Sequence, residues 1–176
     1  GPQGQPAMKS DIRSVAALRD TMAAYYRSLG DAAERKAAPV AWCTSVGPAE
    51  LLRALGFAVF FPENHAAMLG TARRANTVMP RAHAMGYSQD ICSYLTSDIG
   101  AFLADETPLA AFGLTGTPKA DVLVFNTNQC RDVRDWFEFY GRKWGVPVIG
   151  VRSPRALDDV RESDVDAVAT QIEALV

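Results

Sequence analysis

The run DVLVF at residues 121–125 constrains the fold more than any other stretch of this sequence. An unbroken apolar run with polar residues on both sides fits a strand that is buried on both faces of a sheet. Three further runs have the same character: PVAWCTS at 39–45, FAVFF at 57–61 and VPVIGV at 146–151. Amphipathic stretches separate these runs. The alternation predicts an α/β fold, a Rossmann-like or flavodoxin-like three-layer sandwich with a mostly parallel sheet.

Apolar residues at helical spacing predict where the helices lie. A first helix covers residues 10–29 and ends at Gly30, and a polar connector follows at residues 30–38. A short helix begins with Gly47 as its N-cap and Pro48 as its first residue. Further helices are expected within 65–86, from Ser88 or Asp90 onward, from about Val133 to Gly145, and after a Ser163 cap.

The last helix and the first residues define the expected limits of the domain. The helix carries an apolar stripe of Val165, Val168, Ile172 and Leu175, which either packs on this domain or leads into a second one. Residues 1–8, GPQGQPAM, are interpreted as a cloning remnant or a disordered lead-in. We therefore expect a single α/β domain over residues 9–176.

Composition and charge argue against two classes of partner, nucleic acids and membranes. The chain has 176 residues, 48% of them hydrophobic and 22% charged, with a net charge of -2. No basic run provides a patch for nucleic acid, so no nucleic-acid partner is expected. No apolar run approaches the roughly 20 residues of a membrane-spanning helix, and no signal peptide opens the chain, so we expect no membrane partner and a cytoplasmic location.

The three cysteines, Cys43, Cys92 and Cys130, fall where strands pass into helices or where helices begin. Ligands of open parallel sheets bind beyond the carboxyl ends of the strands, so these thiols can gather at one edge of the sheet. Helix N-termini favour thiolates, and thiolates bind iron–sulfur clusters. No CxxC pair is present, and Cys92 shares a helical face with Leu95 and Ile99. From the spacing alone, burial in the core is therefore the favoured explanation of the cysteines.

Two other residues follow a strand end and are candidates for contact with a substrate, Glu63 and His65 in PENH. A lone histidine is more often a structural residue than a catalyst, and His83 is a weaker candidate still. No GxGxxG, Walker loop or nucleophile elbow is present, so nucleotide-dependent chemistry by this chain is not supported.

Three motifs in order resemble the N-terminal half of the 2-hydroxyacyl-CoA dehydratase family, which includes benzoyl-CoA reductase subunits. They are WCTSVGPAELLRALGF with FFPEN, DICSYLTSDIGAFL, and DVLVFNTNQCRD, and the resemblance covers roughly residues 39–153. It implies that the chain is the N-terminal domain of a longer subunit with two Rossmann-like domains. It also implies a [4Fe-4S] cluster, or in one branch a double-cubane cluster, held between those domains.

The resemblance also implies an activity and its partners. An ATP-hydrolysing activator protein would inject one low-potential electron, and the cluster would pass it to an acyl-CoA for ketyl-radical dehydration or for reduction. Cys92 and Cys130 match the family's cluster ligands, and Cys43 matches a position that holds either a ligand or a group near the open iron site. The amides of Asn126, Asn128 and Gln129 could tune the cluster by hydrogen bonding. Helix capping is an equal alternative for Asn128.

The resemblance further implies a dimeric catalytic component, with a second subunit that is identical or different. On this interpretation the longer parent is a lyase or an oxidoreductase, and the 176-residue chain alone is inactive. Two alternatives stay open from the residues. One is a double-cubane-type redox protein that reduces small molecules, and the other is a metal-free flavodoxin-like interaction domain whose cysteines are core residues.

Overall fold

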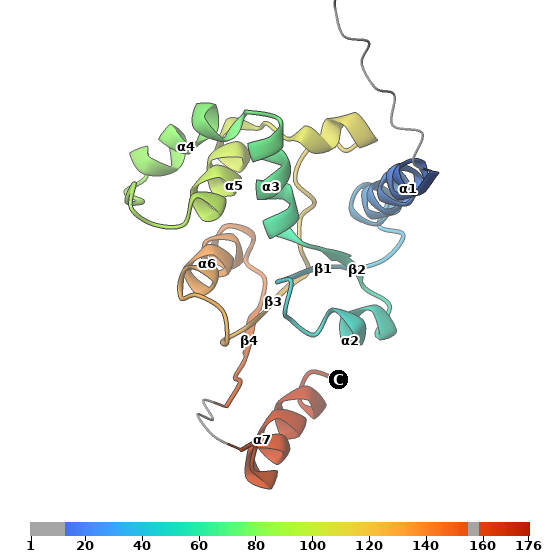
Figure 1. Cartoon of the computed structure of the whole chain (residues 1–176), viewed down its shortest axis with the longest axis vertical. Coiled ribbons are helices and arrows are strands. Elements are labelled where there is room, and N and C mark those ends of the chain that lie inside the picture. Colours follow the sequence, from blue (N-terminus) through green and yellow to red (C-terminus); the bar gives the residue numbers. More distant parts are fainter. Residues whose placement is uncertain (1–12, 155–158) are drawn as a thin grey trace, which may run out of the picture.

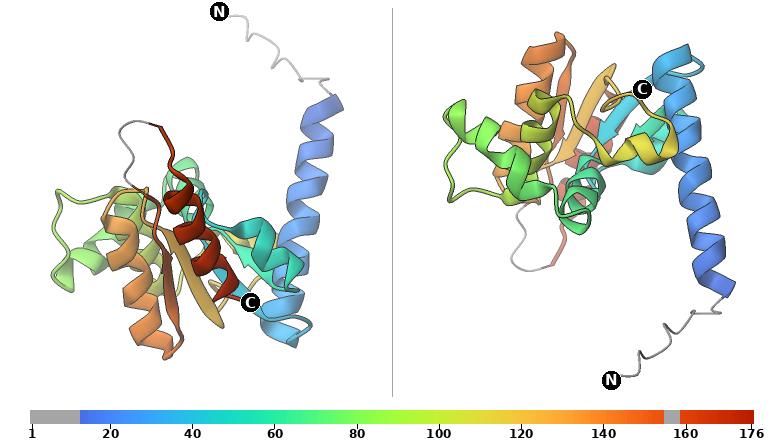
Figure 2. Two further views of the ribbon diagram at one scale, coloured as in Figure 1. Left: turned by 90° about the horizontal axis from the view of Figure 1, so that it is seen from below. Right: turned by 90° about the horizontal axis from the view of Figure 1, so that it is seen from above.

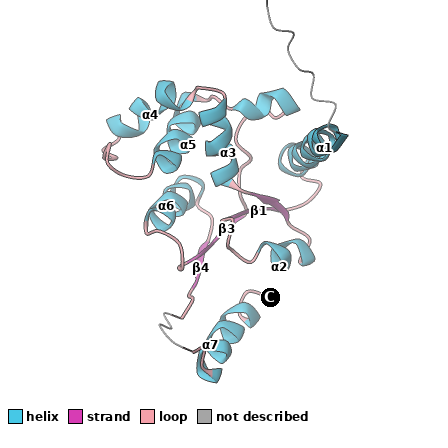
Figure 3. Ribbon diagram, in the orientation of Figure 1, coloured by secondary structure: helices cyan, strands magenta, loops and turns pink. Residues whose placement is uncertain are grey.

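Four parallel strands form the centre of the protein and helices cover both of their faces (Figures 1 and 3). The structure is a computed structural model that describes residues 13–154 and 159–176. The predicted lead-in at residues 1–8 lies outside these ranges. The observed three-layer arrangement confirms the predicted α/β class and the parallel sheet.

The strands are β1 (Val40–Cys43), β2 (Ala58–Phe60), β3 (Val122–Asn126) and β4 (Val148–Val151), each within a predicted apolar run or, for β3, one residue past it. Their order in the sheet is β2-β1-β3-β4. β1 is therefore a central strand, and Trp42 pairs in register with Phe60 on one side and with Leu123 on the other. The chain leaves β1 toward β2 and leaves β3 toward β4, so the winding direction reverses between β1 and β3.

The helices divide unequally between the two faces. The larger layer contains α1 (Arg13–Arg35), α3 (Pro62–Thr71), α4 (Ala75–Ala84), α5 (Ser93–Ala104), the 3₁₀ helix η1 (Pro108–Phe112) and α6 (Asp132–Trp144). The opposite layer contains α2 (Ala49–Ala54) and α7 (Glu162–Glu173). Figure 2 shows α7 across the sheet from below and the first half of α1 extending past the sheet.

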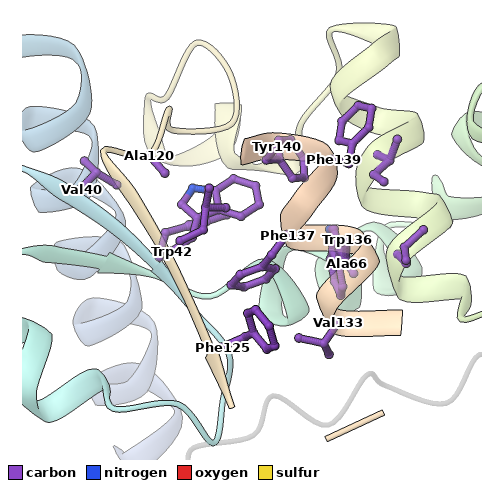
Figure 4. Packing of buried hydrophobic residues seen from close by; sticks show 14 of the residues in the cluster. Val40, Trp42, Ala66, Ala120, Phe125, Val133, Trp136, Phe137, Phe139 and Tyr140 are labelled. Carbon is purple, nitrogen blue, oxygen red and sulfur yellow. The ribbon is translucent and has the colours of Figure 1, made fainter. Parts of the chain in front are cut away.

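Successive side chains of each strand point to opposite faces of the sheet, so a hydrophobic core forms on each face. Trp42 points toward the larger layer, where its ring lies 4.4 Å from that of Tyr140 and 4.8 Å from that of Phe60, measured between centroids (Figure 4). The neighbouring residues Ala41 and Cys43 point the other way, into a smaller core with Leu52 of α2. Large aromatic side chains thus fill much of one side of the sheet, and mostly aliphatic residues fill the other.

The first helix is longer than predicted. It runs through Gly30 to Arg35, so the predicted connector at 30–38 is mostly helical. The reason is tertiary: Leu29 and Ala32 are buried, and Gly30 lies against Leu114, whose side chain would be 3.4 Å from a Cβ at that position. The apolar stripe at the start of this helix stays in solvent, since Leu18 is 69% exposed.

Other predicted helix boundaries also differ from the observed ones. The region expected to be helical over 65–86 forms two helices, separated by a turn in which Arg73 has a left-handed φ of 56°. The next helix begins at Ser93 with Cys92 as its N-cap, later than the predicted start near residues 88–90. Pro48, rather than Gly47, is the N-cap of α2, and Arg161, rather than Ser163, is that of α7.

The predicted stripe of the last helix is only partly covered. No residue within α7 is fully buried, and Val165 is 56% exposed. Only Leu175, just past the end of the helix, packs against the smaller core. Across the described ranges, the helices include none whose length and apolar character would let it cross a membrane.

Candidate functional site

The carboxyl ends of β1 and β3 meet at the point where the winding of the sheet reverses, which is where ligands of open α/β sheets bind. Two hydrogen bonds hold the strand ends together. The backbone N–H of Thr44 donates to the Val124 carbonyl at 3.3 Å, and the Asn126 side-chain amide donates to the Val46 carbonyl at 3.5 Å. The loops after the two strands therefore form one surface.

Glu63 links these loops to a third element. It lies in the first turn of α3, directly after β2. Its carboxylate accepts a hydrogen bond from the Ser45 backbone N–H at 2.6 Å and another from the Gln129 side-chain amide at 2.8 Å. Of the predicted site residues, Glu63 and Gln129 are thus brought into direct contact, and the contact joins the loops that follow β1, β2 and β3.

Cys92 is linked to the segment that contains Cys130 by Asp132, a residue that the sequence analysis did not single out. Cys92 is the N-cap of α5, and its backbone N–H donates to the Asp132 carboxylate at 3.0 Å. Asp132 is the first residue of α6, and Cys130 precedes it by two positions. Cys92 is half-buried and Cys130 is exposed, and the two residues lie at the N-termini of two neighbouring helices.

Cys43 lies elsewhere. It is fully buried on the face of the sheet that α2 covers, whereas Cys92 packs against the aromatic core on the opposite face. A Cβ built on Gly47 would lie 2.6 Å from the Cys43 sulfur, so the loop lies directly against this atom. Burial, with smaller effects from Glu63 and Glu50, raises the pKa of the Cys43 thiol to about 12. The third thiol is therefore protonated and enclosed, and the structure does not bring it together with the other two.

His65 is also inside the protein. Its side chain is fully buried, with Nδ1 2.5 Å from an Asp98 carboxylate oxygen and Nε2 2.9 Å from the Thr107 hydroxyl. Asp98 is also fully buried and accepts further hydrogen bonds from the Trp136 indole at 2.8 Å and the Tyr140 hydroxyl at 2.7 Å. With both ring nitrogens paired and no exposed surface, His65 links α3 to α5 and to the start of η1, while Asp98 links α5 to α6. Its surroundings do not support the predicted contact with a substrate.

The amides after β3 stabilise their own turn. The Asn126 side-chain oxygen accepts hydrogen bonds from the Asn128 backbone N–H at 3.2 Å and from the Ser153 hydroxyl at 2.5 Å. The N-cap of α6 is Arg131, so the alternative in which Asn128 caps that helix is wrong. The Asn128 side chain remains at the exposed surface of the turn.

Two buried oxygens at this edge lack a hydrogen-bond partner among the described residues: the Thr44 hydroxyl and the Gln129 side-chain carbonyl. An unpaired buried polar atom costs about 1–3 kcal/mol, so such atoms are rare unless a ligand satisfies them. Both lie in the loops that Glu63 joins. Together with the two cysteines at helix N-termini, they are of the chemical types that surround an iron–sulfur cluster.

The donor set is nevertheless incomplete within the described ranges, which hold no group of three or more His, Cys, Asp or Glu side chains placed to bind a metal ion. Of the three cysteines, Cys92 and Cys130 are the two that lie at the starts of the neighbouring helices α5 and α6. Asp132 could have been found from the sequence, because an acid in the first turn of a helix is a common stabilising residue. Asp98 could not, because its partners lie 33 to 42 residues away.

The sequence model of the family described as 2-hydroxyglutaryl-CoA dehydratase, D-component, matches residues 44–176. The chain is 30% identical over 169 residues, 96% of its length, to the (R)-2-hydroxyisocaproyl-CoA dehydratase alpha subunit of Clostridioides difficile. It is 40% identical over 80 residues, 46% of its length, to the (R)-2-hydroxyglutaryl-CoA dehydratase alpha subunit of Acidaminococcus fermentans. It is 25% identical over 105 residues, 60% of its length, to a benzoyl-CoA reductase subunit of Thauera aromatica. The matches span 40%, 17% and 24% of these relatives.

Proposed function

This chain belongs to the 2-hydroxyglutaryl-CoA dehydratase D-component family, and from that premise we propose that it provides part of an iron–sulfur cluster site in an acyl-CoA dehydratase or reductase. One observation carries the proposal. The hydrogen bond from the Cys92 N–H to Asp132 joins the start of α5 to the start of α6, two residues after Cys130. Similarity to relatives named as dehydratase subunits and as a benzoyl-CoA reductase subunit supports the reaction class.

In this proposal Cys92 and Cys130 are the ligands from this chain. Cys92 is the N-cap of α5 and Cys130 lies two residues before α6, and the thiolate is the form of cysteine that binds iron. Further ligands come from the rest of a longer subunit, because the chain spans 40% of its relative from Clostridioides difficile. When bound, a [4Fe-4S] or double-cubane cluster supplies one low-potential electron to the substrate.

Other residues at this edge of the sheet would place hydrogen-bonding groups around the proposed cluster. The Thr44 hydroxyl has no acceptor in the described chain and can donate to a cluster sulfide. Glu63 holds the Gln129 amide nitrogen, which leaves the unpaired Gln129 carbonyl free to accept a hydrogen bond from a hydroxyl or amide of the substrate. Asn128 lies in the same turn. Cys43 is not assigned as a ligand, because burial raises its pKa and keeps its thiol protonated.

The partners follow from the same comparison. Two of the named relatives are alpha subunits, which supports a second subunit in the assembly. We propose an acyl-CoA substrate and an ATP-dependent activator protein as the electron donor. We assign the cytoplasm as the compartment because thiols stay reduced there.

The test is iron and acid-labile sulfide analysis, with EPR of the reduced sample, on the full-length parent purified anaerobically with its second subunit. Cys92→Ser and Cys130→Ser are expected to lose the cluster signal and most of the iron. Cys43→Ser is the matched control, since it removes a thiol from the opposite face of the sheet, and its iron content is expected to equal that of the wild type.

Two results would contradict this assignment. Full iron and sulfide in Cys92→Ser would remove the thiol from the ligand set. A folded wild-type protein that cannot be reconstituted with iron and sulfide would favour a metal-free interaction domain. Product analysis with 2-hydroxyacyl-CoA and with aromatic acyl-CoA then separates dehydration from reduction. Electron transfer to small molecules with neither ester consumed would indicate a double-cubane-type redox protein.

A further inference from the structure

Asp132 places a carboxylate directly against the backbone of Cys92. It is the first residue of α6, and its side-chain oxygen accepts a hydrogen bond of 3.0 Å from the Cys92 N–H. Cys130 precedes it in the chain by two residues. The same carboxylate is therefore the hydrogen-bond partner of one proposed cluster ligand and a near neighbour in sequence of the other.

The acceptor for the Cys92 N–H comes from a different helix. Cys92 is the N-cap of α5, and in a capping box an acidic or amide side chain three residues later accepts the N–H of the N-cap. That position is Leu95, which is buried and has no acceptor atom in its side chain. Asp132 takes this part from α6, which lies beside α5 (Figure 1). The Cys92 N–H is thus committed to a negatively charged oxygen.

A carboxylate in this position acts on a bound iron–sulfur cluster in two ways. The potential of such a cluster depends on the hydrogen bonds that its sulfurs accept and on the charge around it. Because the Cys92 N–H donates to Asp132, it is not offered to a sulfur of the cluster. The negative charge of Asp132 also opposes the addition of an electron nearby. Both effects disfavour the reduced form, so both lower the reduction potential.

The other charged side chains at the starts of α5 and α6 are more open to solvent. Asp135 shares the first turn of α6 with Asp132 but is exposed, whereas Asp132 is half-buried. Arg131 and Asp90, which lie next to Asp132 and close to Cys92 in the chain, are exposed as well. Water and salt screen exposed charges more strongly than partly buried ones. Asp132 should therefore influence a bound cluster more than these neighbours do.

We propose that Asp132 lowers the reduction potential of the cluster bound by Cys92 and Cys130, through its own charge and through its hold on the Cys92 N–H. This inference rests on the proposed function for the presence of the cluster. It assigns to a residue outside the ligand set the task of keeping the bound electron strongly reducing, which electron transfer to an acyl-CoA requires.

The experiment is a redox titration, followed by EPR, of the full-length parent purified anaerobically with its second subunit. Asp132→Asn removes the charge but keeps an oxygen that can accept from the Cys92 N–H. It should favour the reduced form about tenfold, which equals a rise of about 59 mV for one electron. Asp132→Ala also frees the N–H for a cluster sulfur, so its potential should rise further.

Asp135→Asn is the matched control. It removes an acid from the same first turn of α6, so both asparagine variants lose a similar favourable interaction with the helix dipole. Because Asp135 is exposed, its loss should change the reduction equilibrium by less than about twofold. A purely structural role of Asp132 would lower the free energy of unfolding in urea and leave the potential unchanged.

The hydrogen bond itself is tested in the iron-free parent by amide hydrogen exchange. The Cys92 amide should exchange slowly in the wild type and in Asp132→Asn, and faster in Asp132→Ala, because only alanine removes the acceptor. Equal exchange of this amide in the wild type and in Asp132→Ala would remove the contact on which the proposal depends.

Three results of the titration would overturn the inference and leave the cluster assigned. They are unchanged or lower potentials in both Asp132 variants, a shift in Asp135→Asn as large as that in Asp132→Asn, and a loss of iron in Asp132→Asn as complete as in Cys92→Ser. The last result would make Asp132 a ligand. A wild-type protein without iron and sulfide contradicts the proposed function, and this inference with it.

Discussion

Replacing Asp98 tests whether the buried polar network holds the larger helical layer together. The carboxylate accepts hydrogen bonds from three buried side chains, Trp136, Tyr140 and His65. Asp98→Ala leaves all three donors without a partner in an interior that excludes water. At about 1–3 kcal/mol for each orphaned donor, the free energy of unfolding should fall by about 3–9 kcal/mol. A loss of this size is comparable with the whole stability of a typical domain.

Asp98→Asn should cost much less. The asparagine carbonyl can accept from Trp136 and Tyr140, while its amide donates to Nδ1 of His65 if the imidazole carries its proton on Nε2. The charge-assisted part of these bonds is lost, which we expect to lower stability by about 1.5–3 kcal/mol. The difference in the free energy of unfolding between Asp98→Ala and Asp98→Asn therefore measures the cost of leaving the three donors unpaired, separately from the loss of the charge.

The assay is urea unfolding followed by tryptophan fluorescence, since Trp42 and Trp136 are both buried in this layer. Asp105→Asn is the matched control. Asp105 is exposed at the end of the same helix with a φ of 55°, a conformation that asparagine adopts equally well, so its effect should stay within about 0.5 kcal/mol. Losses below about 1 kcal/mol for both Asp98 variants would refute the reasoning, as would equal losses for alanine and asparagine.

Two further predictions concern the loop after β1. Gly47→Ala should lower the free energy of unfolding by about 1–3 kcal/mol in urea, because the new Cβ lies 2.6 Å from the Cys43 sulfur. The double variant with Cys43→Ala should recover part of this loss. If it recovers none, the contact with Cys43 is not the cause. Thiol labelling of the folded, cluster-free chain at pH 8 should modify Cys130 quickly and Cys43 only on unfolding, and rapid labelling of Cys43 would refute its burial. Burial raises the pKa of the Cys43 thiol from 9.0 to about 12. Its contribution to stability is therefore complete below pH 9 and is lost between pH 9 and 12. In a series of unfolding curves measured across this pH range, Cys43→Ala should abolish this pH dependence.

The strands and the class of fold could be predicted because they depend on near neighbours in the chain. Each apolar run is short, is bounded by polar or turn residues, and is followed by an amphipathic stretch, so strand, helix and direction follow locally. The candidate edge of the sheet followed from the same pattern, and the structure places Glu63 and Gln129 there in contact. The errors lie at boundaries, where Gly30 continues a helix because Leu29 and Ala32 are buried on either side of it.

The face on which each cysteine lies was decided only by the tertiary structure. Cys43 ends a strand whose side chains alternate, so it points to the α2 side, whereas Cys92 and Cys130 lie just before helices of the opposite layer. A spacing along the chain cannot distinguish these cases, because it contains no information on which elements pack together. The same holds for the carboxylate of Asp98, which collects donors from α3 and α6. The sequence by itself determined the strands, the helices and the sheet edge that they form, because local patterns encode them. Packing between distant segments decided which side chains share that edge.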